Sequence, residues 1–313
     1  MQINHTTKGV LLVLATAIIS GVAIFSNAYF VTKTNPDTFN FLKNSLTAAG
    51  VLCIILVGAK YSSRKNFNQV KSLTKKDWGK LTIVGLIGGS IPFILFFQGL
   101  AMINGTSGAL IHKTLFILVA IPAIIFLKEK PGKLFFALML LLFAGNAMLL
   151  NADFSQIGIG HLLVLSATIF WAAENVFSKH LLKEISGTTL AFGRMFFGSI
   201  FILVYMALTT NLATAFSLNA EQWTHVLIAT IFLIGYVLTW YNGLKHVPVT
   251  LATSILLIGA PITTFLNWIF LNKGLTLNQI TGSFIIIGAL AVWIAVAIGK
   301  EKHTAKKLSP AGR

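Results

Sequence analysis

The sequence has few acidic residues, which argues against a soluble domain, and a single cysteine, which excludes an internal disulfide. Only eight of its 313 residues are Asp or Glu, and charged residues of both signs make up 10%, whereas soluble domains carry about 25%. Cys53 stands alone, so the chain cannot form an internal disulfide. The seven histidines are scattered singly, and the phosphate-binding pattern Gly-x-x-x-x-Gly-Lys-Ser/Thr does not occur. We therefore expect no metal site, no cofactor and no enzyme active site.

Long apolar runs dominate what is present. Hydrophobic residues make up 56% of the chain, and many stand in runs near the ~20 residues that cross a bilayer as a helix. The first run is too long for the apolar part of a signal peptide, so we interpret it as a retained helix. The predicted fold class is an all-α membrane protein with ten transmembrane helices, at 9–31, 38–58, 81–102, 107–127, 134–151, 157–178, 188–210, 223–243, 249–271 and 278–298.

The placement of the cations predicts the orientation of these spans. The net charge is +16, from 24 Lys and Arg. With a cytoplasmic N-terminus, nineteen cations fall in the inner loops and termini, two in the outer loops and three within spans. This bias follows the positive-inside rule, so we predict an integral multi-pass protein of a bacterial or archaeal plasma membrane, with both termini cytoplasmic. The basic segment 60–80 is explained by orientation and contact with anionic lipid, and needs no nucleic acid.

The chain is a duplication of one membrane unit. A shift of 151 residues places Gly9-Val-Leu-Leu-Val-Leu14 on Gly160-His-Leu-Leu-Val-Leu165, and a shift of 144 places Gly99-Leu100 on Gly243-Leu244. Since each unit holds five spans, an odd number, the second unit enters the membrane from the opposite side. Inverted repeats of this kind are typical of secondary transporters. We predict a first repeat at 9–151, a second at 157–298, and a charged, disordered cytoplasmic tail at 299–313.

The two repeats resemble a known family. The shift of 151 residues also aligns Lys43 with Arg194, a cation in the second span of each repeat. Together with ten spans and two five-helix units, this is similar to the drug/metabolite transporter superfamily, EamA type. Matching motifs are Ser166-Ala-Thr-Ile-Phe-Trp171, Leu190-Ala-Phe-Gly-Arg194, Gly259-Ala-Pro261 and Phe126-Leu-Lys-Glu129. Departures are Ser20 for Trp, Lys43 for Arg, Phe116 near the usual Pro, and Lys273-Gly274 at the usual acid. The resemblance implies transport of small metabolites, often amino acids or related compounds, by alternating access.

Five ionisable side chains are the main candidates within spans, where charge is costly and usually functional. Counted from the span ends, Lys43, His112 and Lys113 lie in the outer half, and Glu174 and Arg194 lie in the inner half. We expect unpaired cations in the outer half and a Glu174–Arg194 ion pair in the inner half, with a structural, gating or proton-coupling role. Lys43 and Lys113 could neutralise a substrate carboxylate or phosphate, or their long side chains could snorkel to the outer interface. His112 is a further candidate substrate-binding residue, or a packed polar group.

Polar and aromatic side chains complete the predicted substrate site. Asn44 follows Lys43, Trp171 lies one helical turn before Glu174, Asn175 directly follows Glu174, and Tyr241 stands in the eighth span. Aromatic walls with a few polar groups suit a small organic ligand. Aromatic residues in membranes also serve as packing or interfacial anchors, so that alternative stays open.

These features favour a secondary transporter for a small polar metabolite, an amino acid or related compound, working by proton coupling or by exchange. Three alternatives remain: a membrane-embedded enzyme acting on lipid, a carrier that exchanges phosphorylated or nucleotide-like metabolites, and a channel or scaffold. The expected partners are a small-molecule substrate and the lipid bilayer, without nucleic acid. Monomer and homodimer are both compatible with the sequence.

Overall fold

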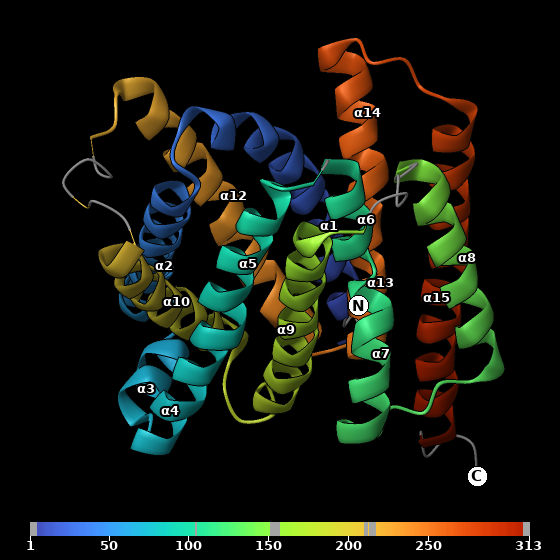
Figure 1. Ribbon diagram of the computed structural model, residues 1–313. Coiled ribbons are helices and arrows are strands. Elements are labelled where there is room, and N and C mark those ends of the chain that lie inside the picture. The colour runs from blue at the N-terminus through green and yellow to red at the C-terminus, as the bar shows by residue number, and fades with distance from the viewer. Residues whose placement is uncertain (1–4, 104, 151–156, 210–211, 213–216, 309–313) are drawn as a thin grey trace.

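The structure is a computed structural model that describes residues 5–103, 105–150, 157–209, 212 and 217–308. Throughout these ranges every regular element is a helix, and ten helical segments are long and apolar enough to cross a membrane. This confirms the predicted all-α membrane fold with ten spans (Figure 1).

The first five spans contain more helices than spans, because two of them are interrupted. Span three is made of α4, η2 and α5, and span four is made of α6 and α7. The elements are α1 (His5–Phe30), η1 (Val31–Lys33), α2 (Pro36–Tyr61), α3 (Lys65–Ser72), α4 (Lys75–Val84), η2 (Gly85–Ser90), α5 (Ile91–Leu100), α6 (Gly105–Lys113), α7 (Leu115–Phe126) and α8 (Lys133–Leu150).

The second five spans follow the same plan, except that their third span, α12, is uninterrupted. The elements are α9 (Ile159–Leu181), α10 (Gly187–Thr209), α12 (Ala220–Leu244), α13 (Val249–Ile255), η3 (Leu256–Ile258), α14 (Gly259–Leu271) and α15 (Leu277–Leu308). The prediction of a disordered tail from residue 299 is wrong up to Leu308, since α15 continues to that residue. Ala, Lys, Glu and Leu, which are strong helix formers, make up much of this extension. Residues 309–313 lie outside the described residues.

The packing of the spans shows the inverted repeat. The first span of each repeat packs on the third span of the other repeat. Helix α1 packs along α12, and α9 packs along α5. The mates α2 and α10 pack on each other, and so do α8 and α15. A pseudo-twofold axis therefore passes between α2 and α10 on one side of the bundle and between α8 and α15 on the other, as their places in Figure 1 agree.

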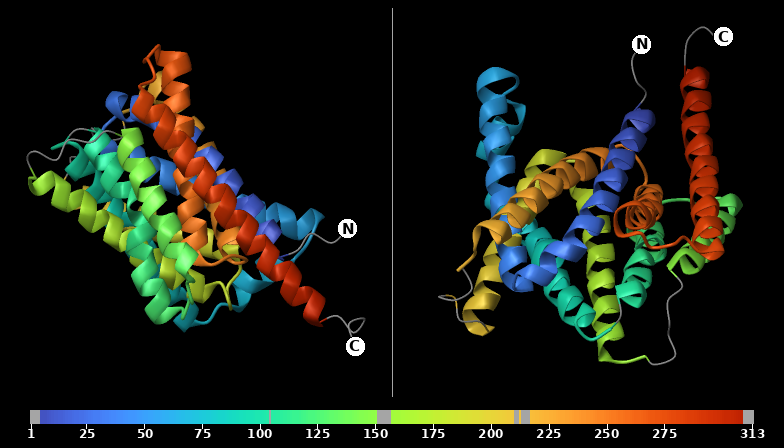
Figure 2. Two further views of the ribbon diagram at one scale, coloured as in Figure 1. Left: turned by 90° about the vertical axis from the view of Figure 1, so that its right-hand side faces the viewer. Right: turned by 90° about the horizontal axis from the view of Figure 1, so that it is seen from above.

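Both ends of the described chain lie at the same end of the bundle. In the two views of Figure 2, the start of α1 and the end of α15 lie at the end that also carries α3. We call this the α3 end. An even number of spans requires this arrangement, and the loop between α1 and α2 lies at the opposite end.

Span three is interrupted where it meets α10. Residues Gly85–Ser90 form a π-helical turn, and Pro92 follows two residues later. A Cβ atom on Gly89 would lie 2.6 Å from the Arg194 carbonyl oxygen, and one on Gly198 would lie 2.7 Å from the Gly89 carbonyl oxygen. The backbones of η2 and α10 thus touch, which only glycine permits. This contact fixes η2 at the centre of the bundle.

Candidate functional site

The centre of the site is the backbone carbonyl of Gly88. In an α-helix this oxygen would accept a hydrogen bond from the N–H of residue 92, but Pro92 has none. Two side chains from the second repeat take its place: Trp171 Nε1 donates to it over 3.1 Å and Arg194 Nη2 over 2.9 Å. Asn44 Nδ2 donates to the next carbonyl, that of Gly89, over 3.3 Å. Helices α2, α9 and α10 therefore converge on one interrupted turn.

Two buried cations flank this turn without a carboxylate partner. The side chains of Lys43 and Arg194 are 5% and 6% exposed. Lys43 Nζ lies 3.2 Å from Asn40 Oδ1, and it lies 5.1 Å from the Phe39 ring centroid and 5.5 Å from that of Phe93. Lys43 and Arg194 are near enough to repel each other. Within the described residues no Asp or Glu oxygen lies within 4.0 Å of either cation.

Glu174 is buried beside the same turn but does not bond Arg194. Its Oε1 accepts a hydrogen bond from the Tyr241 hydroxyl over 2.7 Å and another from the Ser178 hydroxyl. A Cβ on Gly88 would lie 2.9 Å from Glu174 Cδ and 3.1 Å from Arg194 Nε, so Gly88 stands between the two groups. The predicted Glu174–Arg194 ion pair is therefore wrong. The two side chains meet at Gly88 as their matching positions predicted, but Glu174 bonds two hydroxyl groups and Arg194 bonds the Gly88 carbonyl.

An aromatic cluster covers one side of the turn. Trp171 makes edge contacts with Phe93, Phe96 and His112, at ring-centroid distances of 5.4, 5.5 and 4.8 Å. Phe96 also contacts His112 at 5.3 Å. Buried His112 Nδ1 has no hydrogen-bond partner. The cluster provides an apolar wall next to the two cations.

The structure brings most of the predicted site residues together and separates two. Asn44, Trp171, Glu174 and Arg194 lie against η2. His112 contacts Trp171, Tyr241 contacts Glu174, and Lys43 lies near Arg194, so Lys43 and Arg194 are close together and not separated as the prediction had them. Asn175 lies apart, because its Oδ1 accepts a hydrogen bond from Trp240 Nε1 over 3.2 Å, which is a packing contact between α9 and α12. Lys113 is half-buried, and it forms no hydrogen bond or ion pair with the described residues.

Several residues of this site were not predicted from the sequence. Gly88 and Gly89 supply the carbonyls, Asn40 and Phe93 contact Lys43, and Ser178 contacts Glu174. The signal for the carbonyls was the run Gly88-Gly-Ser-Ile-Pro92 inside an apolar span, because interrupted helices mark binding sites in transporters. Across the described residues, no three His, Cys, Asp or Glu side chains are grouped to hold a metal ion.

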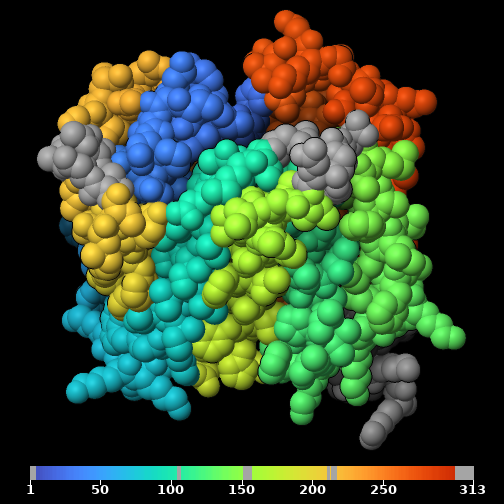
Figure 3. All heavy atoms as spheres, in the orientation of Figure 1, coloured from blue at the N-terminus to red at the C-terminus, as the bar shows by residue number. Residues whose placement is uncertain are grey.

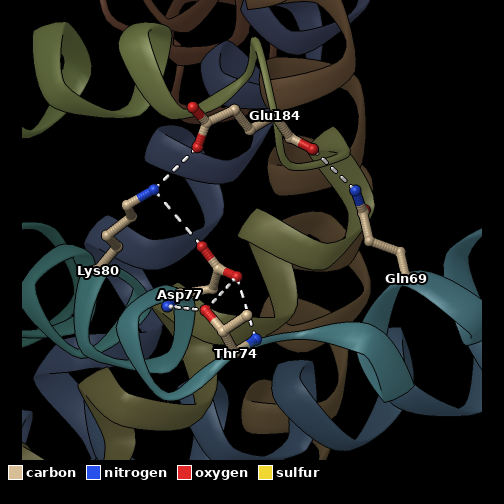
Figure 4. A network of polar contacts seen from close by, with 5 residues as sticks. All are labelled: Gln69, Thr74, Asp77, Lys80 and Glu184. Atoms are coloured by element: carbon tan, nitrogen blue, oxygen red, sulfur yellow. Dashed lines mark hydrogen bonds and ion pairs between the residues drawn. The ribbon is translucent and has the colours of Figure 1, made fainter.

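A polar clamp joins the two repeats at the α3 end (Figure 4). Lys80 Nζ of α4 lies 2.8 Å from Glu184 Oε2 and 3.4 Å from Asp77 Oδ1. Gln69 of α3 donates to the Glu184 carbonyl over 3.0 Å and accepts from the Ser186 N–H over 2.8 Å. Asp77 also closes a capping box with Thr74, the N-cap of α4. Thr74 thus caps the helix that begins span three.

A second contact reinforces closure at the α3 end. The Glu129 carboxylate accepts hydrogen bonds from the Val249 N–H over 2.7 Å and the Thr250 hydroxyl over 2.6 Å, and so caps α13. The matching position in the second repeat is Lys273, which cannot accept a hydrogen bond. This cap therefore has no counterpart of its kind at the opposite end.

The segments related to the polar clamp by the repeat symmetry meet at the opposite end of the bundle. Asn219 and Gln222 form a capping box at the start of α12, as Thr74 and Asp77 do at the start of α4. Gln222 Nε2 donates to the Lys33 carbonyl over 2.6 Å, and Lys33 aligns with Glu184 under the 151-residue shift. His225 stacks on Phe30 at a centroid distance of 4.3 Å. The two ends are thus closed by symmetry-related segments with different chemistry.

Comparisons with known proteins agree with this architecture. The model of the EamA-like transporter family matches residues 7–151 and 158–295. An uncharacterized transporter of Synechocystis sp. is 25% identical over 94% of this chain and 87% of its own length. The uncharacterized transporter YyaM of Bacillus subtilis is 24% identical over 93% of this chain and 95% of its own length. One solved crystal structure superposes with a TM-score of 0.75 at 17% identity, covering 94% of this chain and 98% of that one.

Proposed function

This chain belongs to the EamA-like transporter family, and on that premise we propose that it is a secondary transporter for a small carboxylate-bearing metabolite, an amino acid or related compound. The substrate would bind beside the interrupted turn of span three. The chain would carry it by alternating access, with the α3 end facing the cytoplasm.

The observation that carries this proposal is a pair of buried cations that have no carboxylate oxygen of the described residues within 4.0 Å, with Gly88 standing between Arg194 and the buried Glu174. A buried charge is unfavourable unless it is paired, so Lys43 and Arg194 favour an anionic group between them. Arg194 Nε and Asn44 Oδ1 are buried and have no hydrogen-bond partner. The first can donate to a carboxylate, and the second can accept from an ammonium group. The aromatic cluster around Trp171 would hold the apolar part of the substrate.

The same geometry supports a mechanism. Gly88 and Gly89 belong to the first repeat, whereas Trp171 and Arg194 belong to the second, so the site lies where the repeats meet. Alternating access requires one repeat to move against the other around such a site. For the cytoplasmic side to open, the polar clamp must break, and for the other side to open, the Gln222–Lys33 contact must break.

Saturable counterflow tests this function. In proteoliposomes preloaded with unlabelled L-amino acids, we expect uptake of the labelled compound that saturates with concentration and is driven by the preload. Amides and phosphorylated sugars serve as comparison substrates. Flux that rises linearly with concentration would refute a carrier, and preference for phosphorylated compounds would refute the carboxylate assignment.

Replacing Lys43 with Gln should weaken a carboxylate substrate about 10- to 100-fold, since a hydrogen bond to a charged group contributes about 1.5–3 kcal/mol. The neutral amide of the same compound should lose little. The measurement is the half-saturating concentration in counterflow for acid and amide. Lys113→Gln is the matched control, because Lys113 donates no hydrogen bond to the η2 carbonyls, whose donors are Asn44, Trp171 and Arg194. Equal losses for acid and amide would refute the charge-pairing role.

Reversing one charge of the polar clamp should slow exchange several-fold, and reversing both should restore it. In Glu184→Lys two like charges face each other across the repeats, whereas the double variant Lys80→Glu/Glu184→Lys re-forms the pair. Lys80 holds the pKa of Glu184 below its usual range. Because a lowered carboxyl pKa stabilises the contact above that pKa and loses it only as pH falls through it, the clamp should persist under mildly acidic conditions. Exchange rates of the unmodified protein, Glu184→Lys and the double variant from pH 5 to pH 8 provide the check, and a double variant as slow as the single would contradict the pairing.

A further inference from the structure

An apolar groove lies on the surface of the bundle, away from the substrate site. It has a volume of about 670 Å³ and runs between α7 and α9, which lie side by side on the face shown in Figure 3. Ala172 and Ala173 form a shallow floor on α9, and Pro122 forms part of the α7 wall. The rims are apolar and open, since the Ile121 and Phe126 side chains are 64% and 73% exposed.

The length of the groove matches one leaflet of a bilayer. On α9 it extends from Ile169 to His180, which is about 16 Å at ~1.5 Å per residue. On α7 it extends from Leu118 to Leu127, about 13 Å on the same rise. The hydrocarbon core of a bilayer is about 30 Å thick, so each leaflet contributes about 15 Å.

The groove is polar only at its α3 end. His180 is its one titratable lining residue. Exposed Lys183 follows His180 in the chain, and exposed Lys128 and Lys130 follow Leu127. Of the two acids nearby, Glu184 pairs with Lys80, whereas Glu129 keeps its charge while it caps α13. Lys128, Lys130 and Lys183 outnumber that one remaining acid, so an apolar channel one leaflet long ends in a region of net positive charge.

We propose that this groove binds an anionic phospholipid of the leaflet at the α3 end. One acyl chain would lie between α7 and α9 over Ala172 and Ala173. The phosphate headgroup would contact His180, Lys128, Lys130 and Lys183. A neutral lipid would fill the same groove without the charge contacts, so the site distinguishes lipids by headgroup. Because α9 also carries Trp171 and Glu174 on its buried side, the lipid would pack on the back of a helix that forms the substrate site.

Lipid retention in native mass spectrometry tests the site directly. We expect the full-length protein, purified in detergent with equal phosphatidylglycerol and phosphatidylcholine, to retain phosphatidylglycerol about tenfold or more over phosphatidylcholine, since each lysine near an anionic lipid favours binding. Ala173→Phe, which fills the groove from an exposed position, should reduce retention of both lipids. Lys128→Gln/Lys130→Gln/Lys183→Gln should remove the preference and leave phosphatidylcholine unchanged.

The control variant removes the same charge elsewhere at the same end. Lys65→Gln/Lys75→Gln/Lys76→Gln changes three exposed lysines of α3 and α4 and should keep the preference. Equal retention of both lipids by the unmodified protein would overturn the proposal, as would equal losses in the two triple variants. A dimer whose mass shifts to monomer in Ala173→Phe would also overturn it, because a second copy would then occupy the groove. The readout does not depend on transport.

Discussion

Replacing Gly88 with alanine is expected to reduce transport about 100-fold or more. The added Cβ would overlap Glu174 Cγ and would lie 2.9 Å from Glu174 Cδ. Overpacking of this kind is unfavourable by about 1–3 kcal/mol. To make room, Glu174 and Arg194 must move, which weakens hydrogen bonds of charged groups that contribute about 1.5–3 kcal/mol each. Since a tenfold change corresponds to about 1.4 kcal/mol, the sum reaches two decades.

A second glycine in the same span provides the control. A Cβ on Gly79 of α4 would meet no atom within 4 Å, so Gly79→Ala should transport normally. Both variants are compared by initial rates of counterflow at equal amounts of folded protein, judged by size-exclusion chromatography. If Gly88→Ala matched Gly79→Ala, the interrupted turn would have no role in transport.

Replacing Glu174 with Gln is expected to abolish the pH dependence of net uptake while exchange survives. Glu174 is the one acid among the buried residues of the described chain, with 1% exposure. A proton-coupled carrier must protonate and release such a group in each cycle. Gln keeps the size and can still accept the Tyr241 hydrogen bond, but it carries no proton. Net uptake driven by a pH gradient should therefore fall at least tenfold, whereas substrate-for-substrate exchange should change by less than about threefold.

The control for this prediction is an exposed acid. Glu221 at the start of α12 has a side chain that is 59% exposed, so Glu221→Gln should keep both activities. Uptake is measured in proteoliposomes at external pH 5.5, 6.5 and 7.5 with constant internal pH. If Glu174→Gln kept the pH dependence of the unmodified protein, Glu174 would have only a structural role, as a buried acceptor for Tyr241 and Ser178.

The sequence was sufficient for the fold but only partly for the site. The duplication and the odd number of spans predict the inverted repeat, because both follow from counting. Lys43 and Arg194 are recognisable as repeat mates on the same grounds. Their approach to each other was not predictable, since positions along two spans give depth but not the rotation of each helix about its axis. The packing of α2 on α10 supplies that rotation.

The Glu174–Arg194 pair shows a second limit of sequence reasoning. Equal depth on consecutive spans brings the two side chains to the same region, and this inference was sound. Which group each of these two side chains bonds depends on the backbone between them. Gly88 stands there, and its carbonyl is open only because Pro92 lacks an N–H. Such an effect arises from a third segment, which is distant in sequence from α9 and α10.

Because different contacts close the two ends, the salt concentration of the medium affects the two ends differently. The polar clamp depends in part on an exposed ion pair, whereas its mate consists of a neutral hydrogen bond and a ring stack. At physiological ionic strength the Debye length is about 8 Å, and it shortens as salt rises. Added salt therefore weakens one closure and leaves the other nearly unchanged. Under the proposed alternating access, the balance between the two open forms should therefore depend on the electrolyte on the side of the α3 end, even when no substrate is present.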